Sequence, residues 1–377
     1  MKNLSTLFLV IALFSCQDRT KTEFVISGNI EDAPDSTIVQ LRARYGNVTQ
    51  LVATDTIIDG NFEFRDTLEA RPAKMVLVAT DWKNFSGTCQ FWADYTKINI
   101  TGKGKYLSAW EVESNIPEQI AMNKFKNKTK ESDIKGDSLN YVLRNNLGDV
   151  ELEKKIIEER HKNYALKLKE EFEVLKNGIH SQTALEKLSN YLKNAENYEV
   201  EVDKKLVKSL YDNMDIKYRE STFGEGIFFK IANTNIPQVG EKFVNVTLFD
   251  LEGNSHELND YLDKYILLDF WTLGCTHCKD AHHGLKNLQK KYEKNLQVVG
   301  INVDVNKQLW EEATQRDNIS WVNLSDGKGT HAGVYAQYGG KALPTFIFIN
   351  PNGKIIERWQ GFKEGIFEEK LSKYFQN

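Results

Sequence analysis

One stretch of sequence decides the fold of this chain: Tyr265-Ile-Leu-Leu-Asp-Phe-Trp-Thr-Leu-Gly-Cys-Thr-His-Cys-Lys279. Its first seven residues form an apolar run interrupted only by Asp269, which indicates a buried strand. The run ends shortly before Cys275 and Cys278, whose C-x-x-C spacing is typical of a redox dithiol. The sequence therefore predicts a strand that leads directly into a reactive cysteine pair.

The two cysteines are expected to differ in reactivity. A helix that begins at Thr276 places Cys275 beside its first free N–H groups and the positive end of its dipole, and both favour the thiolate. A cationic His277 would add to this effect. Cys278 lies one turn further along the helix and is expected to be partly buried. We therefore predict that Cys275 is the nucleophile and that Cys278 resolves the mixed disulfide.

From about residue 237 to residue 377 the chain resembles the thioredoxin superfamily. Asp269 stands six residues before Cys275, where thioredoxin-like D-F-W-x-x-x-C sequences carry a buried acid. The resemblance implies an α/β thioredoxin fold and a catalytic Asp269 that shuttles a proton for the inner cysteine. Trp271 is expected to lie half in the core and half in the wall of the site, as an aromatic residue beside an active cysteine often does.

A second segment carries the same resemblance. Ala342-Leu343-Pro344-Thr345 leads into the apolar run Phe346-Ile-Phe-Ile349, which matches the family's cis-proline loop and following strand. An arbitrary X-Pro bond is cis in only about 5 to 6% of cases, so the cis bond is implied by the resemblance alone. The resemblance also implies that Leu343, Pro344 and Thr345 bind substrate, with the Leu343 backbone pairing with a polypeptide. Trp271 and His277 complete the expected substrate-binding residues.

The front of the chain predicts export. Lys2 precedes the apolar run Leu7-Phe-Leu-Val-Ile-Ala-Leu13, which is too short to span a bilayer and is typical of a secretory signal. Leu13-Phe-Ser-Cys16 follows and resembles a bacterial lipobox. We therefore expect residues 1–16 to contain a lipoprotein signal, with Cys16 as the lipidated residue, and the protein to be anchored in the cell envelope, facing the periplasm. Export makes disulfide chemistry available.

Within the superfamily the chain looks most like envelope thiol-disulfide oxidoreductases of the TlpA and ResA type. The similarity rests on the Leu251-Glu-Gly-Asn254 turn, on the Glu257-Leu258 pair that follows it, and on the tethered N-terminus. Two features depart from the usual pattern. Gly274 stands where a Trp or Tyr is usual, and Thr276-His277 is closer to the Pro-His of strongly oxidising DsbA-like proteins than to the Gly-Pro of thioredoxin.

Other interpretations of the cysteine pair are weaker. A structural disulfide across so short a loop would stabilise the fold by only about 2 kcal/mol. A zinc site needs four convergent ligands, and although His277, His282 and His283 lie nearby, the chain has no second C-x-x-C and no H-x-x-x-H. We expect His282 and His283 to form a solvated helix face. A thiol peroxidase is favoured by Thr272 but not by Leu268, which replaces an expected proline.

Composition and pattern organise the rest of the chain. The 377 residues, 41% of them apolar, suffice for more than one domain, and the net charge of −4 without a basic stripe predicts no nucleic-acid partner. Period-two alternation predicts an antiparallel β-domain at residues 23–101, with strands at 24–30, 37–41, 61–64 and 74–78. Its I-x-D-G-x-F-x-F motif from Ile57 to Phe64 is similar to the β-domain that precedes thioredoxin modules in Bacteroidetes lipoproteins. Cys89 is expected to be a buried small hydrophobe.

Helical spacing of apolar residues predicts a middle segment at residues 115–222, with helices at 152–175, 181–192 and 203–214. The expected architecture is thus an N-terminal antiparallel β-domain, a helical middle segment and a C-terminal α/β thioredoxin fold. We predict an exported oxidoreductase that exchanges disulfides with protein substrates and an upstream redox partner, without a cofactor or a bound metal. Two alternatives stay open: a non-catalytic lipoprotein that binds a metal ion or a polypeptide on a thioredoxin scaffold, and a thiol peroxidase.

Overall fold

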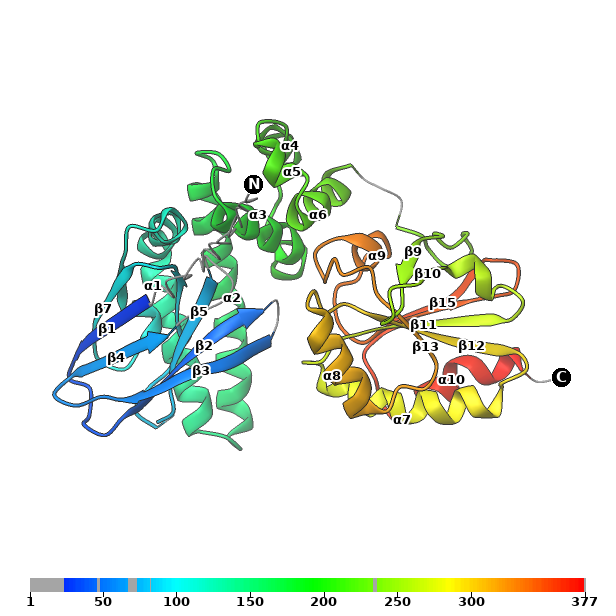
Figure 1. Cartoon of the computed structure of the whole chain (residues 1–377), viewed down its shortest axis with the longest axis horizontal. Helices are drawn as coiled ribbons and strands as arrows, with labels where there is room; N and C mark the ends of the chain where they lie inside the picture. Colours follow the sequence, from blue (N-terminus) through cyan, green and yellow to red (C-terminus); the bar gives the residue numbers. More distant parts are fainter. Residues whose placement is uncertain (1–23, 46–47, 67–72, 82, 233–235, 376–377) are drawn as a thin grey trace, which may run out of the picture.

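The computed structural model describes residues 24–45, 48–66, 73–81, 83–232 and 236–375. The predicted signal and Cys16 lie outside these residues. Figure 1 shows a β-rich part, a helical part and an α/β part that follow one another along the chain, with the helices α3 to α6 bridging the other two. This is the multidomain architecture that the sequence predicts.

The β-rich part consists of two four-stranded sheets, with the orders β4-β1-β7-β8 and β3-β2-β5-β6. The strands are β1 (Phe24–Glu31), β2 (Ile38–Tyr45), β3 (Val48–Thr56), β4 (Asn61–Asp66), β5 (Ala73–Ala79), β6 (Cys89–Ala93), β7 (Lys97–Lys103) and β8 (Glu111–Glu113). Side chains of β1 alternate between buried and less buried positions, and the buried ones share a core with the second sheet. Cys89 is fully buried in this core, which confirms the expectation for it.

The prediction of a purely antiparallel domain is wrong at one pair of strands. β7 pairs with β1 in parallel, with Ile26 opposite Ile98. After β1 the chain builds β2 and β3 of the second sheet, returns to the first sheet as β4 on one side of β1, builds β5 and β6 of the second sheet, and returns again as β7 on the other side of β1. Such a long crossover allows the returning strand to run in the same direction, which a short hairpin does not.

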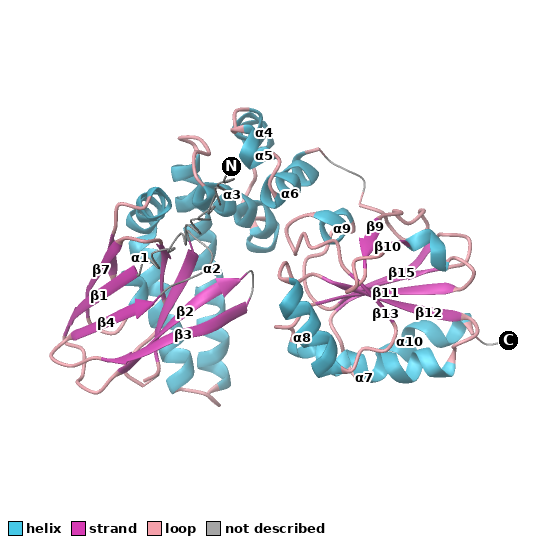
Figure 2. Ribbon diagram, viewed as in Figure 1, coloured by secondary structure: helices cyan, strands magenta, loops and turns pink. Residues whose placement is uncertain are grey.

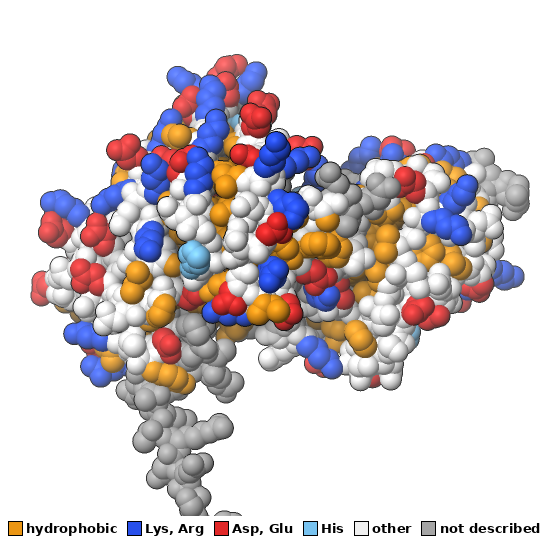
Figure 3. Space-filling model, turned by 90° about the horizontal axis from the view of Figure 1, so that it is seen from above, with side chains coloured by type: hydrophobic (Ala, Val, Ile, Leu, Met, Phe, Trp, Pro, Cys, Tyr) orange, Lys and Arg blue, Asp and Glu red, His pale blue; other side chains and the backbone are white. Residues whose placement is uncertain are grey.

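The helical part contains α1 (Pro117–Asn145), α2 (Val150–Leu175), α3 (Gln182–Asn194), α4 (Lys204–Asp212), α5 (Ile216–Arg219) and α6 (Thr222–Ile231). Side-chain oxygens of Asp149, Ser181, Asp203 and Ser221 cap the N-termini of α2, α3, α4 and α6. Charged side chains of both signs are interspersed over these helices on the face that Figure 3 shows. Among the described residues, no helix is both long and apolar enough to cross a membrane.

The α/β part is built around a five-stranded sheet with the order β13-β12-β11-β14-β15. β11 (Tyr265–Trp271), β12 (Leu296–Asn302) and β13 (Val322–Leu324) are parallel. β14 (Thr345–Ile349) runs antiparallel to β11, and β15 (Ile355–Gln360) runs antiparallel to β14. A separate two-stranded sheet joins β9 (Thr247–Phe249) to β10 (Ser255–Glu257). This arrangement is the α/β thioredoxin fold that the sequence predicts.

Helices cover both faces of this sheet (Figure 2). α7 (Thr276–Lys291) and α10 (Ile366–Leu371) lie on one face, where they pack on Leu267 and Phe346. α9 (Gly333–Gln337) lies on the other face, against Leu268 and Phe270. α8 (Lys307–Asp317) follows β12 at its carboxyl end. Successive residues of β11 therefore contribute to two separate cores, as expected for a strand buried on both faces.

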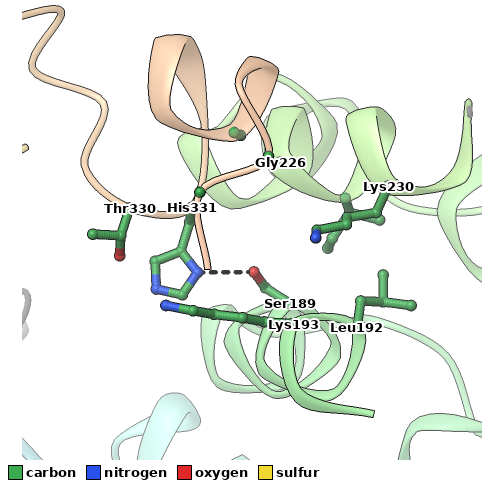
Figure 4. A pocket seen from close by; sticks show the side chains of 11 residues that line it. Ser189, Leu192, Lys193, Gly226, Lys230, Thr330 and His331 are labelled. Atoms are coloured by element: carbon green, nitrogen blue, oxygen red, sulfur yellow. Dashed lines mark hydrogen bonds between the residues drawn. The ribbon is translucent and has the colours of Figure 1, made fainter. Parts of the chain in front are cut away.

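The helical part contacts the α/β part at α9 and at the loop before it. Figure 4 shows Ser189 of α3 opposite His331, with Oγ 3.1 Å from Nδ1. Gly226 of α6 lies so close to this loop that an added Cβ would come within 1.7 Å of the His331 carbonyl oxygen. Lys328 forms an ion pair with Glu225 at 2.8 Å. The middle helices are thus fitted to the α/β part by specific contacts.

Candidate active site

The two cysteines lie at the N-terminus of α7. Cys275 is the N-cap residue of this helix, and its Sγ accepts a hydrogen bond from the backbone N–H of Cys278 at 3.1 Å. Cys275 is partly exposed, whereas Cys278 is fully buried, and the two form a disulfide bond. The helix begins at Thr276, as the sequence predicts. A helix N-terminus favours an anionic sulfur at Cys275, because its free N–H groups and dipole both point toward that position.

The loop that carries Cys275 is held by a network that sequence reasoning missed. The carboxylate of Asp304 accepts hydrogen bonds from the Thr272 hydroxyl, from the Leu273 backbone N–H at 2.9 Å and from the Asn302 amide at 2.9 Å. The backbone N–H of Cys275 donates to the Thr272 carbonyl at 3.2 Å. Asp304 lies two residues after the end of β12, so the segment that follows β12 holds the loop that follows the neighbouring strand β11. The Thr272 hydroxyl is engaged by Asp304.

Asp269 is fully buried on β11, in the strand that leads to the dithiol. Neither of its carboxylate oxygens has a hydrogen-bond partner among the described residues. The ionisable group in contact with it is His282, whose Nε2 lies 3.3 Å from Asp269 Oδ2 without hydrogen-bond alignment. The acid that the resemblance implies is thus present, and it is paired with a histidine.

The expectation that His282 lies on a solvated helix face is wrong. His282 is only 3% exposed, whereas its neighbour His283 is exposed, as expected. The buried side of α7 carries Cys278, Ala281, His282, Leu285 and Leu288, which recur at helical spacing. The position of His282 four residues after Cys278 is the signal that places it on this side. An amphipathic imidazole does not reveal burial by its residue type.

The ring of His282 is held from four directions. Its Nδ1 lies 3.2 Å from Oδ2 of Asp317, and its edges meet the rings of Trp271 and Trp321 at centroid distances of 4.9 and 5.7 Å. Asp269 completes the surroundings on the Nε2 side. The imidazole therefore bridges two carboxylates from β11 and α8.

Arg316 connects this buried group to the protein surface. Its Nε and Nη2 donate to the two carboxylate oxygens of Asp317 at 2.6 and 2.8 Å, and its Nη1 donates to the Leu273 carbonyl at 2.9 Å. Burial by itself would raise the pKa of Asp317, but the Arg316 guanidinium and His282 together hold this pKa below its ordinary value. Asp317 therefore stays ionised at neutral pH.

The proline loop lies beside the dithiol. The Leu343–Pro344 peptide bond is cis, as the resemblance implies. Leu343 is partly buried and packs, as Cys275 does, against a cluster that contains Trp271 and Cys278. In the described part of the chain, no hydrogen bond uses the backbone N–H or C=O of Leu343. Pro344 and Thr345 are buried, and the Thr345 hydroxyl donates to the Ala342 carbonyl at 2.5 Å.

Of the other two predicted substrate-binding residues, Trp271 is buried and His277 is exposed. Trp271 is fully buried, so it supports the site from within and does not form an exposed wall, because β11 is covered on both faces. His277 is exposed, with Nδ1 3.8 Å from Oδ2 of Asp280. Of the three histidines of α7, His277 and His283 are exposed and His282 is buried.

Among the described residues, no three His, Cys, Asp or Glu side chains converge as a metal ion requires.

A cavity of about 1250 Å³ opens beside the dithiol loop. Thr272, Val303, Asp304 and Val305 line it from the carboxyl ends of β11 and β12. The opposite wall comes from the β-rich and helical parts and carries the ion pairs Lys74–Glu186, Lys167–Asp133 and Lys187–Glu171. The active edge of the α/β part therefore faces the rest of the chain across this cavity.

Several known proteins are similar to the C-terminal part of this chain. The AhpC/TSA family matches residues 239–358. The thiol-disulfide oxidoreductase ResA of Halalkalibacterium halodurans is 29% identical over 146 residues, which cover 38% of this chain and 80% of that protein. The protein of the same name from Bacillus cereus is 28% identical over 156 residues, which cover 41% and 85%.

Two solved structures are also similar to this chain. A thiol-disulfide oxidoreductase from Bacteroides fragilis is 29% identical, covers 36% of this chain and 99% of its own, and gives a TM-score of 0.33. The thioredoxin domain of a thiol-disulfide oxidoreductase from Bacteroides vulgatus is 27% identical, covers 37% and 99%, and gives a TM-score of 0.34.

Proposed function

Because the C-terminal part of this chain is a thioredoxin-like thiol-disulfide oxidoreductase domain of the TlpA/ResA type, we propose that it exchanges disulfides with protein substrates through Cys275 and Cys278. One observation carries this proposal. A partly exposed cysteine caps a helix, and a buried cysteine lies one turn behind it. That asymmetry suits one sulfur to attack and the other to resolve.

The reaction follows from this geometry. The Cys275 thiolate attacks one sulfur of a substrate disulfide, so that a mixed disulfide forms and the second substrate sulfur leaves as a thiolate. Cys278 then loses its proton with the help of Asp269 and attacks Sγ of Cys275. The Cys275–Cys278 bond forms, the mixed disulfide breaks, and the substrate leaves reduced with two electrons from the dithiol. An upstream redox partner restores the dithiol, and the reverse sequence oxidises a substrate.

The edge at Leu343 supports a polypeptide substrate. An extended segment that carries the target cysteine pairs with the free backbone groups of Leu343, beside Cys275. Backbone pairing supplies affinity that does not depend on the substrate's side chains. This mode of binding suits an enzyme that acts on several proteins.

Export and anchoring belong to the same proposal. The lipobox-like Leu13-Phe-Ser-Cys16 supports attachment to the envelope through a lipid on Cys16, with the dithiol facing the periplasm. There, a thiol-disulfide enzyme meets protein disulfides that the cytosol would keep reduced. Cell fractionation tests this part. We expect the chain in the membrane fraction and Cys16→Ser in the soluble fraction, and identical fractionation of the two would contradict the anchor.

Insulin reduction and thiol titration test the activity. We expect two additional titratable thiols after treatment with a reductant, and reduction of insulin that is lost in Cys275→Ala. Elemental analysis of the same sample distinguishes the metal-binding alternative. Stoichiometric zinc or copper together with no insulin reduction would favour a binding protein instead.

A further inference from the structure

The buried Asp269 poses a problem for the reaction proposed above. A base that accepts the Cys278 proton has to release it before the next turnover, yet Asp269 is 0% exposed. Both of its oxygens lack a hydrogen-bond partner among the described residues. A proton therefore needs a neighbouring group that can take it onward, and His282 is the ionisable group in contact.

We propose that His282 is a positioning residue for Asp269, which holds this carboxyl group in place and exchanges its proton with Asp317 at the far side of the ring. The inference rests on the proposed dithiol exchange. It adds a histidine and a second aspartate to the resolving step.

The His282 ring lies between the two carboxylates. Nε2 lies 3.3 Å from Asp269 Oδ2, and Nδ1 lies 3.2 Å from Asp317 Oδ2. An imidazole that gains a proton at one nitrogen and releases one at the other transfers a proton across the ring without turning over. The edge contacts of Trp271 and Trp321 keep the ring in this orientation.

The charges around His282 also allow this proton exchange. Arg316 pairs with Asp317 through two hydrogen bonds, so this acid is ionised between turnovers and has oxygens that can accept a proton from the ring. A proton that moves between His282 and Asp269 converts an ion pair into two neutral groups or the reverse, so this move does not create an uncompensated charge in the core.

The proposed proton path from Asp269 through His282 to Asp317 ends close to the protein surface. Asp317 is the last residue of α8, and its side chain is 1% exposed, whereas the side chain of Arg316 is 36% exposed. The groups that face His282 are therefore Asp269 from β11, Asp317 with Arg316 from α8, and Cys278 from its own helix. In the resolving step the Cys278 proton passes to the pair of Asp269 and His282, and the thiolate attacks Cys275.

A chromogenic aryl disulfide separates the two steps. The reduced full chain is mixed with dithiobis(nitrobenzoate) in a Cys16→Ser, Cys89→Ala background, so that the dithiol supplies the reactive thiols. Attack by Cys275 releases a first coloured thiolate, and resolution by Cys278 releases a second. We expect His282→Gln to slow the second release by about tenfold or more and to leave the first within about twofold. The pH profile of the second release should change shape, while that of the first stays the same.

His283→Gln is the matched control, because His283 is the exposed neighbour on the same helix. It should behave as the unmodified background. If His282→Gln does not fold, Asp317→Asn tests the same proposal in the same assay. It should also slow the second release and leave the first unchanged. Equal slowing of both releases, or no change in either, would overturn the role of His282. A background protein without any second release would instead contradict the dithiol exchange itself.

Discussion

Nε2 of His282 lies 3.3 Å from Oδ2 of Asp269, and both side chains are excluded from solvent. The contact joins the strand that leads to the dithiol to the helix that carries it. Because Asp269 has no hydrogen-bond partner among the described residues, His282 is the ionisable side chain that contacts it. Burying an acid without hydrogen bonds costs stability, which favours our proposal that Asp269 serves the reaction.

Replacing the resolving cysteine should trap substrates. Cys278→Ala leaves Cys275 at the helix N-terminus but removes the sulfur that releases the mixed disulfide. We expect covalent adducts with cellular proteins in Cys278→Ala and none in Cys275→Ala, because the buried position of Cys278 keeps it from substrates. Non-reducing electrophoresis followed by mass spectrometry measures the adducts. Equal trapping by both variants would show that the roles are misassigned.

Replacing the buried acid should lower activity and raise stability. Asp269→Asn keeps the size of the side chain and replaces an ionisable group without hydrogen bonds among the described residues by a neutral amide, so the free energy of unfolding should rise by about 1 to 3 kcal/mol. Insulin reduction should fall by about tenfold or more, since Cys278 loses its base. Denaturant titration and the insulin assay measure the two effects. A less stable variant would mean that the contact with His282 outweighs the cost of burial.

The loop before Cys275 should depend on Asp304. Asp304→Ala leaves the Leu273 N–H and the Thr272 hydroxyl without their acceptor, which should cost about 1 to 3 kcal/mol of stability. The attack by Cys275 should slow as well, because the loop loses its link to the end of β12. Thr272→Val removes only one of these hydrogen bonds and should have a smaller effect on both measurements. A Thr272→Val variant as impaired as Asp304→Ala would contradict this assignment.

Acid should weaken the contact between the helical part and the α/β part. Burial, and after it the charges of Lys193 and Lys74, lower the pKa of His331 from 6.5 to about 4. Below pH 6.5 the unfolded chain binds a proton that the folded chain accepts only near pH 4. The contribution of His331 is therefore complete above pH 6.5 and decreases as the pH falls toward 4, by up to about 3 kcal/mol.

His331→Gln removes this titration and keeps a polar side chain opposite Ser189. We expect the free energy of unfolding of the wild type to fall more between pH 7 and pH 4.5 than that of His331→Gln, because other acidic groups titrate in both. Denaturant titrations at the two pH values measure the difference. Parallel losses in the two proteins would show that His331 does not sense pH.

The sequence by itself determined the features that depend on neighbouring residues. The apolar run of β11, the C-x-x-C spacing and the start of α7 are set by side-chain alternation and by the capping of a helix end, which act within a few residues. Together with the resemblance, they predicted the α/β fold, the two cysteines and Asp269. In the middle segment, the spacing of apolar residues likewise predicted α2, α3 and α4.

The long helix α1 did not appear in that pattern. It buries polar residues such as Gln119, whose side-chain oxygen accepts a hydrogen bond from the backbone N–H of Trp92 on β6. A buried polar residue is stable only when a partner satisfies it, and this partner comes from another part of the chain. Apolar periodicity alone therefore did not indicate this helix.

Only the tertiary structure decided what surrounds the dithiol. His282 is bridged to Asp269 and to Asp317, the latter 35 residues away, and Asp304 reaches back 32 residues to Thr272. The parallel pairing of β1 with β7 likewise depends on where the chain returns. The physical reason is the same in each case. Burial and pairing of a polar side chain depend on groups that folding brings to it, and its own neighbours along the chain do not reveal them.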